Sequence, residues 1–218
     1  MNKNFKCAIF DLDGTIINSG PDLLDALNFV LHGKGLQKIK SSVIGNLVGG
    51  GAEAMIRKGY SFLNKKIFDD DIKLMVEDFI NYYSKNCSNK TKIYSGTRST
   101  LSYLKKKNII ICLCTNKRET IAKKILGKLD LDYFFDFVIG SKKGIPLKPD
   151  PYMLDYCIKK FSIKPNETIF VGDSDNDIIP ANNLGIYSVY VNYGYGKLNE
   201  KIIPKLTLSK ISDFKQLF

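Results

Sequence analysis

Two aspartates separated by one residue follow the first apolar run of the chain, in the segment DLDGT that begins at Asp11. Carboxylate oxygens are the ligands that Mg²⁺ takes, usually together with water and substrate phosphate. Clustered carboxylates repel one another, which raises their pKa values unless a cation joins them. A carboxylate also attacks phosphorus to form an aspartyl phosphate. Asp11 and Asp13 therefore indicate cation-assisted phosphoryl chemistry, with Gly14 allowing a tight turn beside the phosphate.

Further polar side chains follow other apolar stretches. Thr115 and Asn116 come after NIIICLC, Lys148 stands between two prolines in PLKPDP, and Asp173 and Asp177 belong to GDSDND after TIFV. Each piece alone has an ordinary explanation, such as a turn, a calcium-loop fragment, a helix N-cap or a solvated lysine. Ligands bind at the carboxyl ends of parallel strands. The ordered set, delivered by separate strand ends and a loop, therefore favours an active site.

The elements that must position these residues alternate along the second part of the chain. Apolar runs predict strands near 6–10, 108–114, 137–139, 168–171 and 187–191. Amphipathic stretches predict helices near 97–107, 119–126, 152–161 and 177–184. This alternation predicts an α/β fold of the doubly wound, Rossmann-like kind, with a parallel sheet covered by helices on both faces.

Residues 16–91 show helical spacing and no convincing strand. We therefore expect an α/β catalytic core domain of residues 1–15 and 92–218, with an all-helical cap domain of residues 16–91 inserted after the first strand. The two crossings, near 16–20 and 91–96, both contain glycine, which absorbs hinge changes. The insert is expected to act as a lid that selects the substrate.

The segment VGGGAEAMIRK within the insert predicts a glycine-rich turn that leads into a helix. Backbone amides at such a helix N-terminus are able to hold a substrate carboxylate, and Lys58 would add a positive charge. The alternative is that the glycines only permit tight packing and that Lys58 is solvated. In the core, Pro180 is expected in the first turn of a helix beginning near Asn176 or Asp177, because a proline inside a helix costs about 3 kcal/mol.

The formal net charge of +11 suggests anionic partners, either nucleic acid or small phosphorylated substrates. The excess is almost all lysine and is scattered along the chain, which favours a solvated surface over a nucleic-acid stripe. No apolar run approaches the roughly 20 residues of a membrane span, and no secretory signal is visible. The five cysteines have no zinc-site spacing and are expected to be reduced core residues of a cytoplasmic protein.

The motifs DLDGT, TN, LKPDP and GDSDND resemble those of haloacid dehalogenase superfamily phosphatases. SGPDL after the first motif and NYGYG near the end look most like the phosphoglycolate phosphatase branch, enzymes of carbohydrate metabolism with a helical cap. The dehalogenase branch needs no second acid, so Asp13 favours phosphoryl chemistry. Asn18 stands where related chains often carry Asp, and we expect this to alter loop packing rather than chemistry.

The resemblance implies a role for each aspartate of the set. Asp11 would be the nucleophile. Asp13 would be the general acid that protonates the leaving oxygen and then the base that activates water. Magnesium, the implied cofactor, would be bound by Asp11, by the backbone carbonyl of Asp13 and by Asp173.

The same resemblance implies supporting roles for the remaining motif residues. Thr115 and Asn116 would position the phosphoryl group. Lys148 would bridge the nucleophile and the phosphate and act in catalysis. Asp177 would support Lys148 or a metal-bound water, and Ser174 is a further supporting residue of the same motif.

The expected activity is a magnesium-dependent phosphatase that hydrolyses a small phosphomonoester, with phosphoglycolate as the first candidate, through an aspartyl phosphate. Alternatives within the superfamily are a pyrophosphatase, a nucleotidase and a sugar-phosphate mutase. A phosphate-receiving signalling module is the alternative outside the enzymes, but such modules lack a helical insert. The expected partner is a small phosphorylated metabolite rather than nucleic acid or membrane, for a monomer or homodimer.

Overall fold

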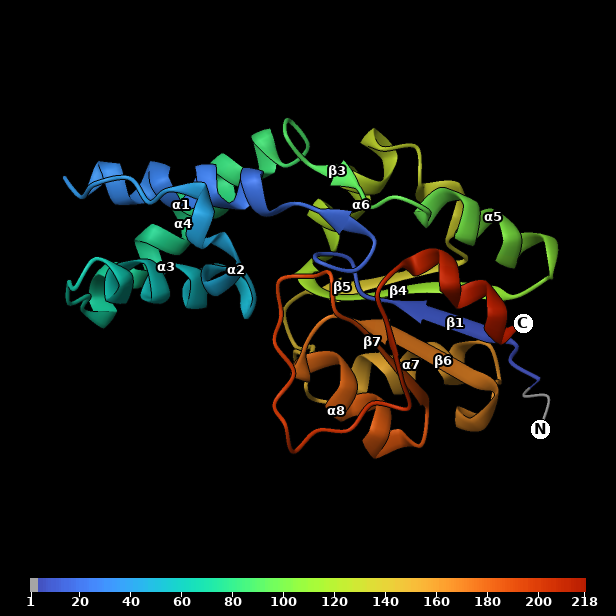
Figure 1. Ribbon diagram of the computed structural model, residues 1–218. Coiled ribbons are helices and arrows are strands. Elements are labelled where there is room, and N and C mark those ends of the chain that lie inside the picture. The colour runs from blue at the N-terminus through green and yellow to red at the C-terminus, as the bar shows by residue number, and fades with distance from the viewer. Residues whose placement is uncertain (1–3) are drawn as a thin grey trace. The chain divides into compact units, whose positions relative to one another are not determined.

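The computed structural model describes residues 4–218, and Figure 1 labels most of their helices and strands. The strands are β1 Cys7–Phe10, β2 Ile17–Asn18, β3 Lys92–Ile93, β4 Ile110–Arg118, β5 Phe137–Ser141, β6 Thr168–Gly172, β7 Tyr187–Val191 and β8 Leu206–Leu208. The helices are α1 Gly20–Gly33, α2 Ile44–Leu47, α3 Gly51–Phe62, α4 Asp69–Asn86, α5 Thr97–Lys106, α6 Glu119–Lys128, α7 Tyr152–Lys160 and α8 Asp175–Leu184. Short 3₁₀ turns cover Ser41–Val43, Asp132–Phe134, Pro165–Glu167 and Ile211–Leu217.

The described chain divides into two compact units. The α/β unit contains the chain up to Asn18 together with Ile93–Phe218, and the helical unit contains Ser19–Lys92. The predicted insert of residues 16–91 starts earlier than the helical unit, at the residues that form β2. That two-residue strand pairs with β3 in a small second sheet, which the helical spacing of this region did not predict.

The α/β unit is built on a six-stranded parallel sheet in the order β5-β4-β1-β6-β7-β8. This arrangement, with its helical insert, confirms the predicted α/β fold class. Phe10 at the end of β1 pairs with Leu113 of β4 and with Val171 of β6. Leu113 and Val171 therefore lie level with the carboxyl end of β1, and the residues that follow these three positions meet at one edge of the sheet.

Strand β4 is longer than its apolar run. It continues to Arg118, so Thr115 and Asn116 lie within the strand instead of after it, and the predicted strand end is wrong. The pairing with β5 shifts between Cys114 and Arg118 because three residues of β4 face the single residue Gly140. Such a bulge bends a strand and re-aims its side chains, which a strand predicted from hydrophobicity does not reveal.

Helix α8 begins at Asp175 and contains Pro180 in its second turn. The prediction that Pro180 lies in the first turn is wrong. The helix starts earlier because Ser174 and Asp177 form its cap. Oδ2 of Asp177 accepts hydrogen bonds from the backbone N–H of Ser174 at 3.0 Å and from its hydroxyl at 2.8 Å. Capping of this kind satisfies backbone groups that the first turn leaves without helical partners.

The helical unit buries one face of each of its longer helices. Helix α1 contributes Leu27 and Leu31, and α4 contributes Met75 and Phe79, all at most 2% exposed. Buried Asp22 joins the beginning of this unit to its end. Its carboxylate accepts hydrogen bonds from the backbone N–H groups of residues 90 and 91 and from the hydroxyl of residue 91, at 2.6 to 3.1 Å. These hydrogen bonds therefore hold the first and last segments of the helical unit together.

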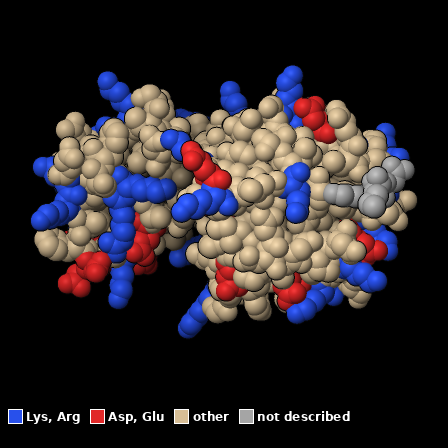
Figure 2. Space-filling view, turned by 60° about the horizontal axis from the view of Figure 1, so that its bottom comes forward, with Lys and Arg blue, Asp and Glu red and all other residues tan. Residues whose placement is uncertain are grey.

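The surface carries the positive charge that the composition predicts. On the face shown in Figure 2, lysine and arginine side chains stand at separate points, with acidic side chains between them. All five cysteines of the sequence are buried free thiols. Within residues 4–218, none of the helices has the length and apolar character needed to span a membrane.

Candidate active site

Lys148 joins two of the predicted carboxylates inside the α/β unit. Its ammonium lies 2.7 Å from Oδ1 of Asp11, 2.7 Å from Oδ1 of Asp177 and 2.9 Å from the carbonyl oxygen of Cys114. An ammonium has three donors, so these contacts account for all of them. The side chain is 2% exposed, and the charge is therefore fixed in one place by buried partners.

Asn116 positions Lys148 through the backbone. Its Oδ1 accepts the N–H of Lys148 at 2.8 Å, and its Nδ2 donates to the carbonyl oxygen of Lys148 at 2.9 Å. This double hydrogen bond connects β4 to the loop that carries the lysine. The predicted contact of Asn116 with a phosphoryl group stays a prediction, whereas its hold on Lys148 is a role that the sequence did not reveal. The hydroxyl of neighbouring Thr115 accepts the N–H of Lys117 at 3.2 Å.

Asp177 uses both of its carboxylate oxygens within the protein. Oδ1 accepts from Lys148, and Oδ2 accepts from the backbone of Asp173 at 3.1 Å and from the backbone and hydroxyl of Ser174. A Cβ on Gly172 would come within 2.2 Å of this side chain, so the glycine makes room for it. These contacts make Asp177 a partner of Lys148.

Asp11, Asp173 and Asp177 offer oxygens that lie within 4.8 Å of one another, and all three are buried. Burial raises the pKa of Asp11 to about 7, against the opposing effect of Lys148. Burial, followed by the charge of Asp177, raises the pKa of Asp173 to about 8. Three carboxylates face one ammonium here. An oxygen-rich cluster short of positive charge fits a hard divalent cation such as Mg²⁺.

Asp13 has a lysine partner of its own. Nζ of Lys117 lies 3.0 Å from Oδ2 of Asp13, and the lysine side chain is only 6% exposed. Lys117 belongs to the bulge of β4, which explains how a strand residue reaches the loop after β1. Sequence patterns do not reveal this pair, because Lys117 lies outside the TN motif and is one of many lysines in the chain.

Gly14 lies beside the carboxylate cluster in the left-handed region, with φ of 84°. A Cβ at this position would come within 2.1 Å of Oδ2 of Asp173. The same oxygen accepts the backbone N–H groups of Tyr195 at 2.7 Å and Gly196 at 2.9 Å. The segment NYGYG, known from the sequence only as a resemblance, therefore contacts the predicted metal ligand directly.

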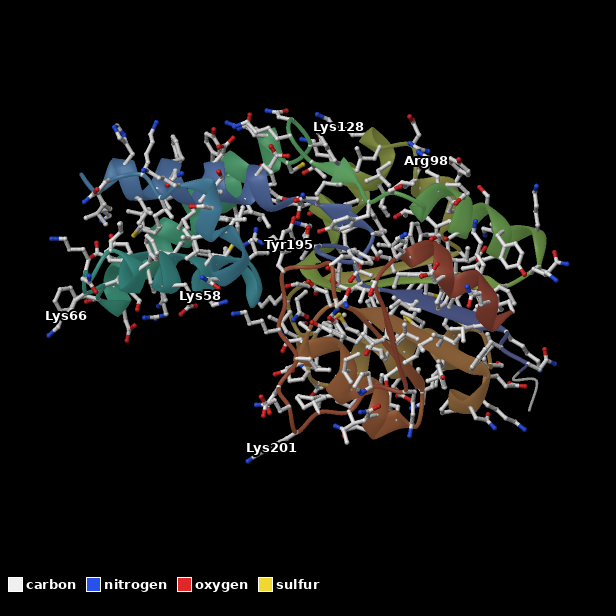
Figure 3. All side chains as sticks on the ribbon, in the orientation of Figure 1. Lys58, Lys66, Arg98, Lys128, Tyr195 and Lys201 are labelled. Atoms are coloured by element: carbon white, nitrogen blue, oxygen red, sulfur yellow. The ribbon has the colours of Figure 1, made fainter. Side chains whose placement is uncertain are left out.

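Lys58 is the one predicted site residue in the helical unit, where Figure 3 labels it on α3. Its Nζ lies 3.5 Å from the carbonyl oxygens of Val48 and Gly49, and desolvation lowers its pKa. Gly49, Gly50 and Gly51 have φ of 105°, 81° and 88°. A Cβ on the first or third would meet nothing within 4 Å, so backbone conformation rather than tight packing requires those two glycines.

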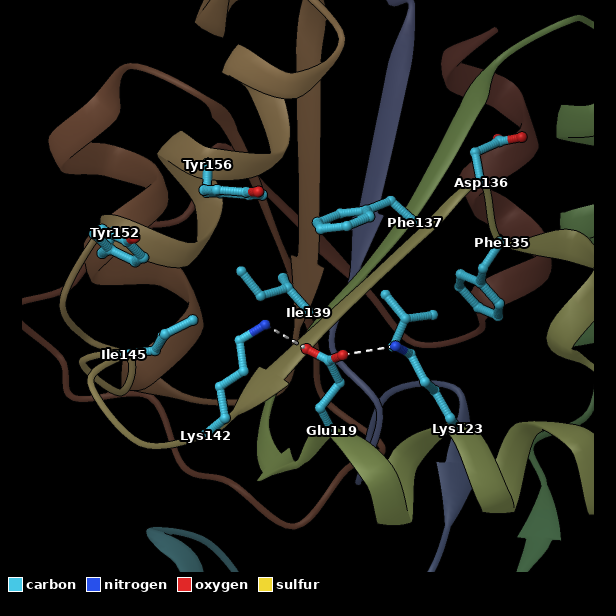
Figure 4. A pocket seen from close by; sticks show the side chains of 11 residues that line it. Glu119, Lys123, Phe135, Asp136, Phe137, Ile139, Lys142, Ile145, Tyr152 and Tyr156 are labelled. Atoms are coloured by element: carbon cyan, nitrogen blue, oxygen red, sulfur yellow. Dashed lines mark hydrogen bonds and ion pairs between the residues drawn. The ribbon is translucent and has the colours of Figure 1, made fainter.

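A pocket of about 520 Å³ lies elsewhere in the α/β unit, along edge strand β5 (Figure 4). Its central charge is Glu119, which accepts from Lys123 at 2.6 Å and from Lys142 at 3.5 Å. Aromatic side chains line the rest, among them Phe137, Tyr152 and Tyr156. None of the site residues predicted from the sequence lines this pocket. The carboxylate cluster remains the candidate active site because it gathers the chemistry-bearing residues.

Comparisons with known proteins agree with this geometry. A sequence model of the family "Haloacid dehalogenase-like hydrolase" matches residues 8–191. The chain is 34% identical over 199 residues to a phosphoglycolate phosphatase of Haemophilus influenzae, covering 89% of each chain. It is 34% identical over 209 residues to a phosphoglycolate phosphatase of Aquifex aeolicus, covering 96% of this chain and 94% of the relative.

A solved structure resembles the whole chain. The crystal structure described as a predicted phosphoglycolate phosphatase from Haemophilus somnus superposes with a TM-score of 0.90 at 29% identity, covering 98% of each chain. The family match spans both the strand that precedes Asp11 and the segment that contains Asp173. The chain therefore belongs to the haloacid dehalogenase-like hydrolases.

Proposed function

We propose that this protein is a magnesium-dependent phosphatase that hydrolyses small phosphomonoesters through an aspartyl phosphate on Asp11, and that phosphoglycolate is its substrate. One observation carries the proposal. Buried Lys148 bridges Asp11 and Asp177 at 2.7 Å each, beside the carboxyl end of β1. A fixed ammonium beside a carboxylate suits a site that receives a phosphoryl group, because it stabilises charge that develops in the transition state.

In the first step, a carboxylate oxygen of Asp11 attacks phosphorus while the bond from phosphorus to the leaving oxygen breaks. Asp13 gives a proton to that oxygen, and Lys117 holds Oδ2 of Asp13 during the transfer. In the second step, water attacks phosphorus and gives a proton to Asp13. The bond between phosphorus and Asp11 breaks, which releases phosphate and restores both carboxyl groups.

Mg²⁺ is the proposed cofactor, and its protein ligands would be Asp11, Asp173 and the backbone carbonyl of Asp13. A bound Mg²⁺ would polarise the phosphoryl oxygens and offset their charge. The cluster fits this ion because it holds three buried carboxylates against one ammonium. Asp177 is the least suited of the three as a ligand, since Lys148 and Ser174 already occupy its oxygens.

The proposed substrate rests on the relatives and on the helical unit. Phosphoglycolate is the substrate named for the two curated relatives, which are 34% identical to this chain. The helical unit offers three consecutive glycines with positive φ, of which Gly49 and Gly50 precede α3 and Gly51 is its first residue. Nζ of Lys58 lies 3.5 Å from the carbonyl oxygens of Val48 and Gly49. We assign this unit the part of a cap that binds the substrate carboxylate, and the α/β unit the part of the catalytic core. Backbone amides of such a turn favour an anion.

A phosphate-release screen tests the proposal. The purified protein is incubated with Mg²⁺ and a panel containing phosphoglycolate, nucleoside monophosphates, sugar phosphates and pyrophosphate. We expect phosphate release that EDTA abolishes, with the highest kcat/KM for phosphoglycolate. A higher kcat/KM for pyrophosphate or for nucleotides would contradict phosphoglycolate as the substrate and would leave the proposed phosphoryl chemistry unchanged. No release from any compound, with or without EDTA, would overturn the phosphatase itself.

A further inference from the structure

The loop that follows β7 holds the side chain of Asp173 in place. We call residues 193–196 the 193–196 loop, and Figure 3 labels Tyr195 on it. Backbone N–H groups of Tyr195 and Gly196 donate to Oδ2 of Asp173 at 2.7 and 2.9 Å. Asp173 itself follows β6, and the loop comes 20 residues later in the chain, so this contact is tertiary. Two donors on one oxygen fix the orientation of the carboxylate.

Glycine is required by packing around this carboxylate. A Cβ on Gly194 would come within 2.4 Å of Cβ and of Oδ2 of Asp173, and a Cβ on Gly196 within 2.2 Å of its carbonyl oxygen. Neither glycine has a positive φ, so close approach rather than backbone conformation excludes a side chain. Gly127 in α6 provides the contrast, because a Cβ there meets nothing within 4 Å.

The loop is itself anchored to the segment that follows DLDGT. The hydroxyl of Tyr195 donates to Oδ1 of Asn18, and the hydroxyl of Tyr193 donates to the carbonyl oxygen of Thr15 at 2.8 Å. The Tyr193 ring packs against Tyr94, with centroids 4.8 Å apart. All of these residues belong to the α/β unit. The loop therefore has fixed contacts on the side away from Asp173 as well.

We propose that the 193–196 loop is a positioning element for the metal ligand Asp173, and that the bond from Tyr195 to Asn18 keeps it in register. This inference rests on the proposed function, because it assumes that Asp173 binds Mg²⁺. The loop donates to Oδ2, which would leave Oδ1 as the oxygen available to the cation. Groups that orient a ligand typically change metal affinity by about 10- to 100-fold when they are removed.

Asn18 has a defined part in this arrangement. Its Oδ1 is the acceptor for the hydroxyl of Tyr195. An aspartate would preserve that acceptor. We therefore expect Asn18→Asp to keep the affinity for Mg²⁺, and Asn18→Ala to lower it as Tyr195→Phe does. The conservative change serves as the rescue that separates a positioning role from general packing.

Titration calorimetry with Mg²⁺ as the only ligand tests the inference, with the thermal midpoint in EDTA as a measure of folding. We expect Gly194→Ala to raise the Kd for Mg²⁺ at least about tenfold, and Tyr195→Phe to raise it measurably but less, because that change leaves both backbone donors to Asp173 in place. Gly127→Ala and Tyr133→Phe are the matched controls, since neither position contacts the loop, and both should keep the wild-type Kd. Asp173→Asn gives the reference for a lost ligand.

Two results would overturn the inference in distinguishable ways. Wild-type Kd in both Gly194→Ala and Tyr195→Phe would show that Asp173 needs no help from the loop, and would leave the proposed function intact. No Mg²⁺ binding by the wild-type protein would remove the proposed cofactor and the inference together. Should Gly194→Ala fail to fold, the comparison of Tyr195→Phe with Asn18→Ala and Asn18→Asp decides the question. Tyr195→Phe removes the hydroxyl that contacts both Asn18 and Tyr94, whereas Asn18→Ala removes and Asn18→Asp keeps the Asn18 acceptor alone.

Discussion

Lys148 and Asp11 are 137 positions apart in the chain, yet Nζ of the lysine lies 2.7 Å from Oδ1 of the aspartate. Burial lowers the pKa of Lys148, but Asp11 and Asp177 outweigh this effect and hold the pKa above its ordinary range. The ammonium is therefore charged throughout the neutral range. In the proposed mechanism it acts as a permanent cation beside the nucleophile.

Replacing Lys148 tests this cation. Lys148→Ala is expected to cost about 2–4 kcal/mol of transition-state stabilisation, or roughly 30- to 1,000-fold in kcat/KM for a phosphomonoester. The reason is that Lys148 supplies the ammonium that contacts Oδ1 of Asp11, at 2.7 Å. Lys143→Ala, on an exposed lysine nearby in sequence, is the control and should keep full activity. Equal activity of the two variants would contradict the role of Lys148.

Replacing Asp11 tests the nucleophile. Asp11→Asn is expected to abolish turnover, because an amide is a poor nucleophile and contributes no charge to the metal site. The measurement is phosphate release together with acid-stable labelling of the protein by a radioactive phosphoester. Neither signal should appear in the variant. Turnover that persists in Asp11→Asn, in a protein with the wild-type thermal midpoint, would move the nucleophile to another residue.

Replacing Lys117 tests its ion pair with Asp13. Lys117→Met is expected to lower kcat/KM strongly for an alkyl phosphate and only slightly for p-nitrophenyl phosphate. An alkoxide needs a proton from Asp13 as it leaves, whereas a nitrophenolate leaves without one. Asp13→Asn should show the same dependence on the leaving group, to a larger extent.

The comparison of these two variants separates the roles of the two residues. A uniform loss in Lys117→Met, with a leaving-group-dependent loss in Asp13→Asn, would make Lys117 a packing residue only. A uniform loss in Asp13→Asn would argue against Asp13 as the acid. Values of kcat are measured as well, since they include the hydrolysis of the aspartyl phosphate.

Replacing Lys58 tests the proposed substrate contact of the helical unit. Lys58→Ala is expected to lower kcat/KM for phosphoglycolate, mainly by raising KM. The kcat/KM for a neutral aryl phosphate should not change, because only phosphoglycolate carries a carboxylate that the ammonium can bind. Lys66→Ala, on an exposed lysine of the same unit, should change neither substrate. Equal loss on both substrates, or none, would exclude Lys58 as a specificity residue.

The local sequence predicted the core strands well because apolar runs identify buried parallel strands. Strand β7, Tyr187–Val191, was predicted to the residue. Two element boundaries were predicted wrongly, one because of a helix cap and the other because of a strand bulge. Asp177 and Ser174 start α8 early enough to place Pro180 in its second turn, and the β4 bulge carries Thr115 and Asn116 within a strand. The spacing of hydrophobic residues contains no information about the cap or the bulge.

The sequence by itself determined the family, the α/β fold with its helical insert, and the residue types of the site. The motifs are short and contiguous in the sequence, and most of them lie at the ends of strands. A linear pattern is therefore sufficient to find them. The tertiary structure alone decided which partner each of them has: Asn116 for the backbone of Lys148, Lys117 for Asp13, and Tyr195 for Asp173. The residues of these pairs are between 22 and 104 positions apart in the chain, and Lys117 with Asp13 is the most distant pair. Their formation depends on strand order, a bulge and close glycine packing, which only the folded chain brings together.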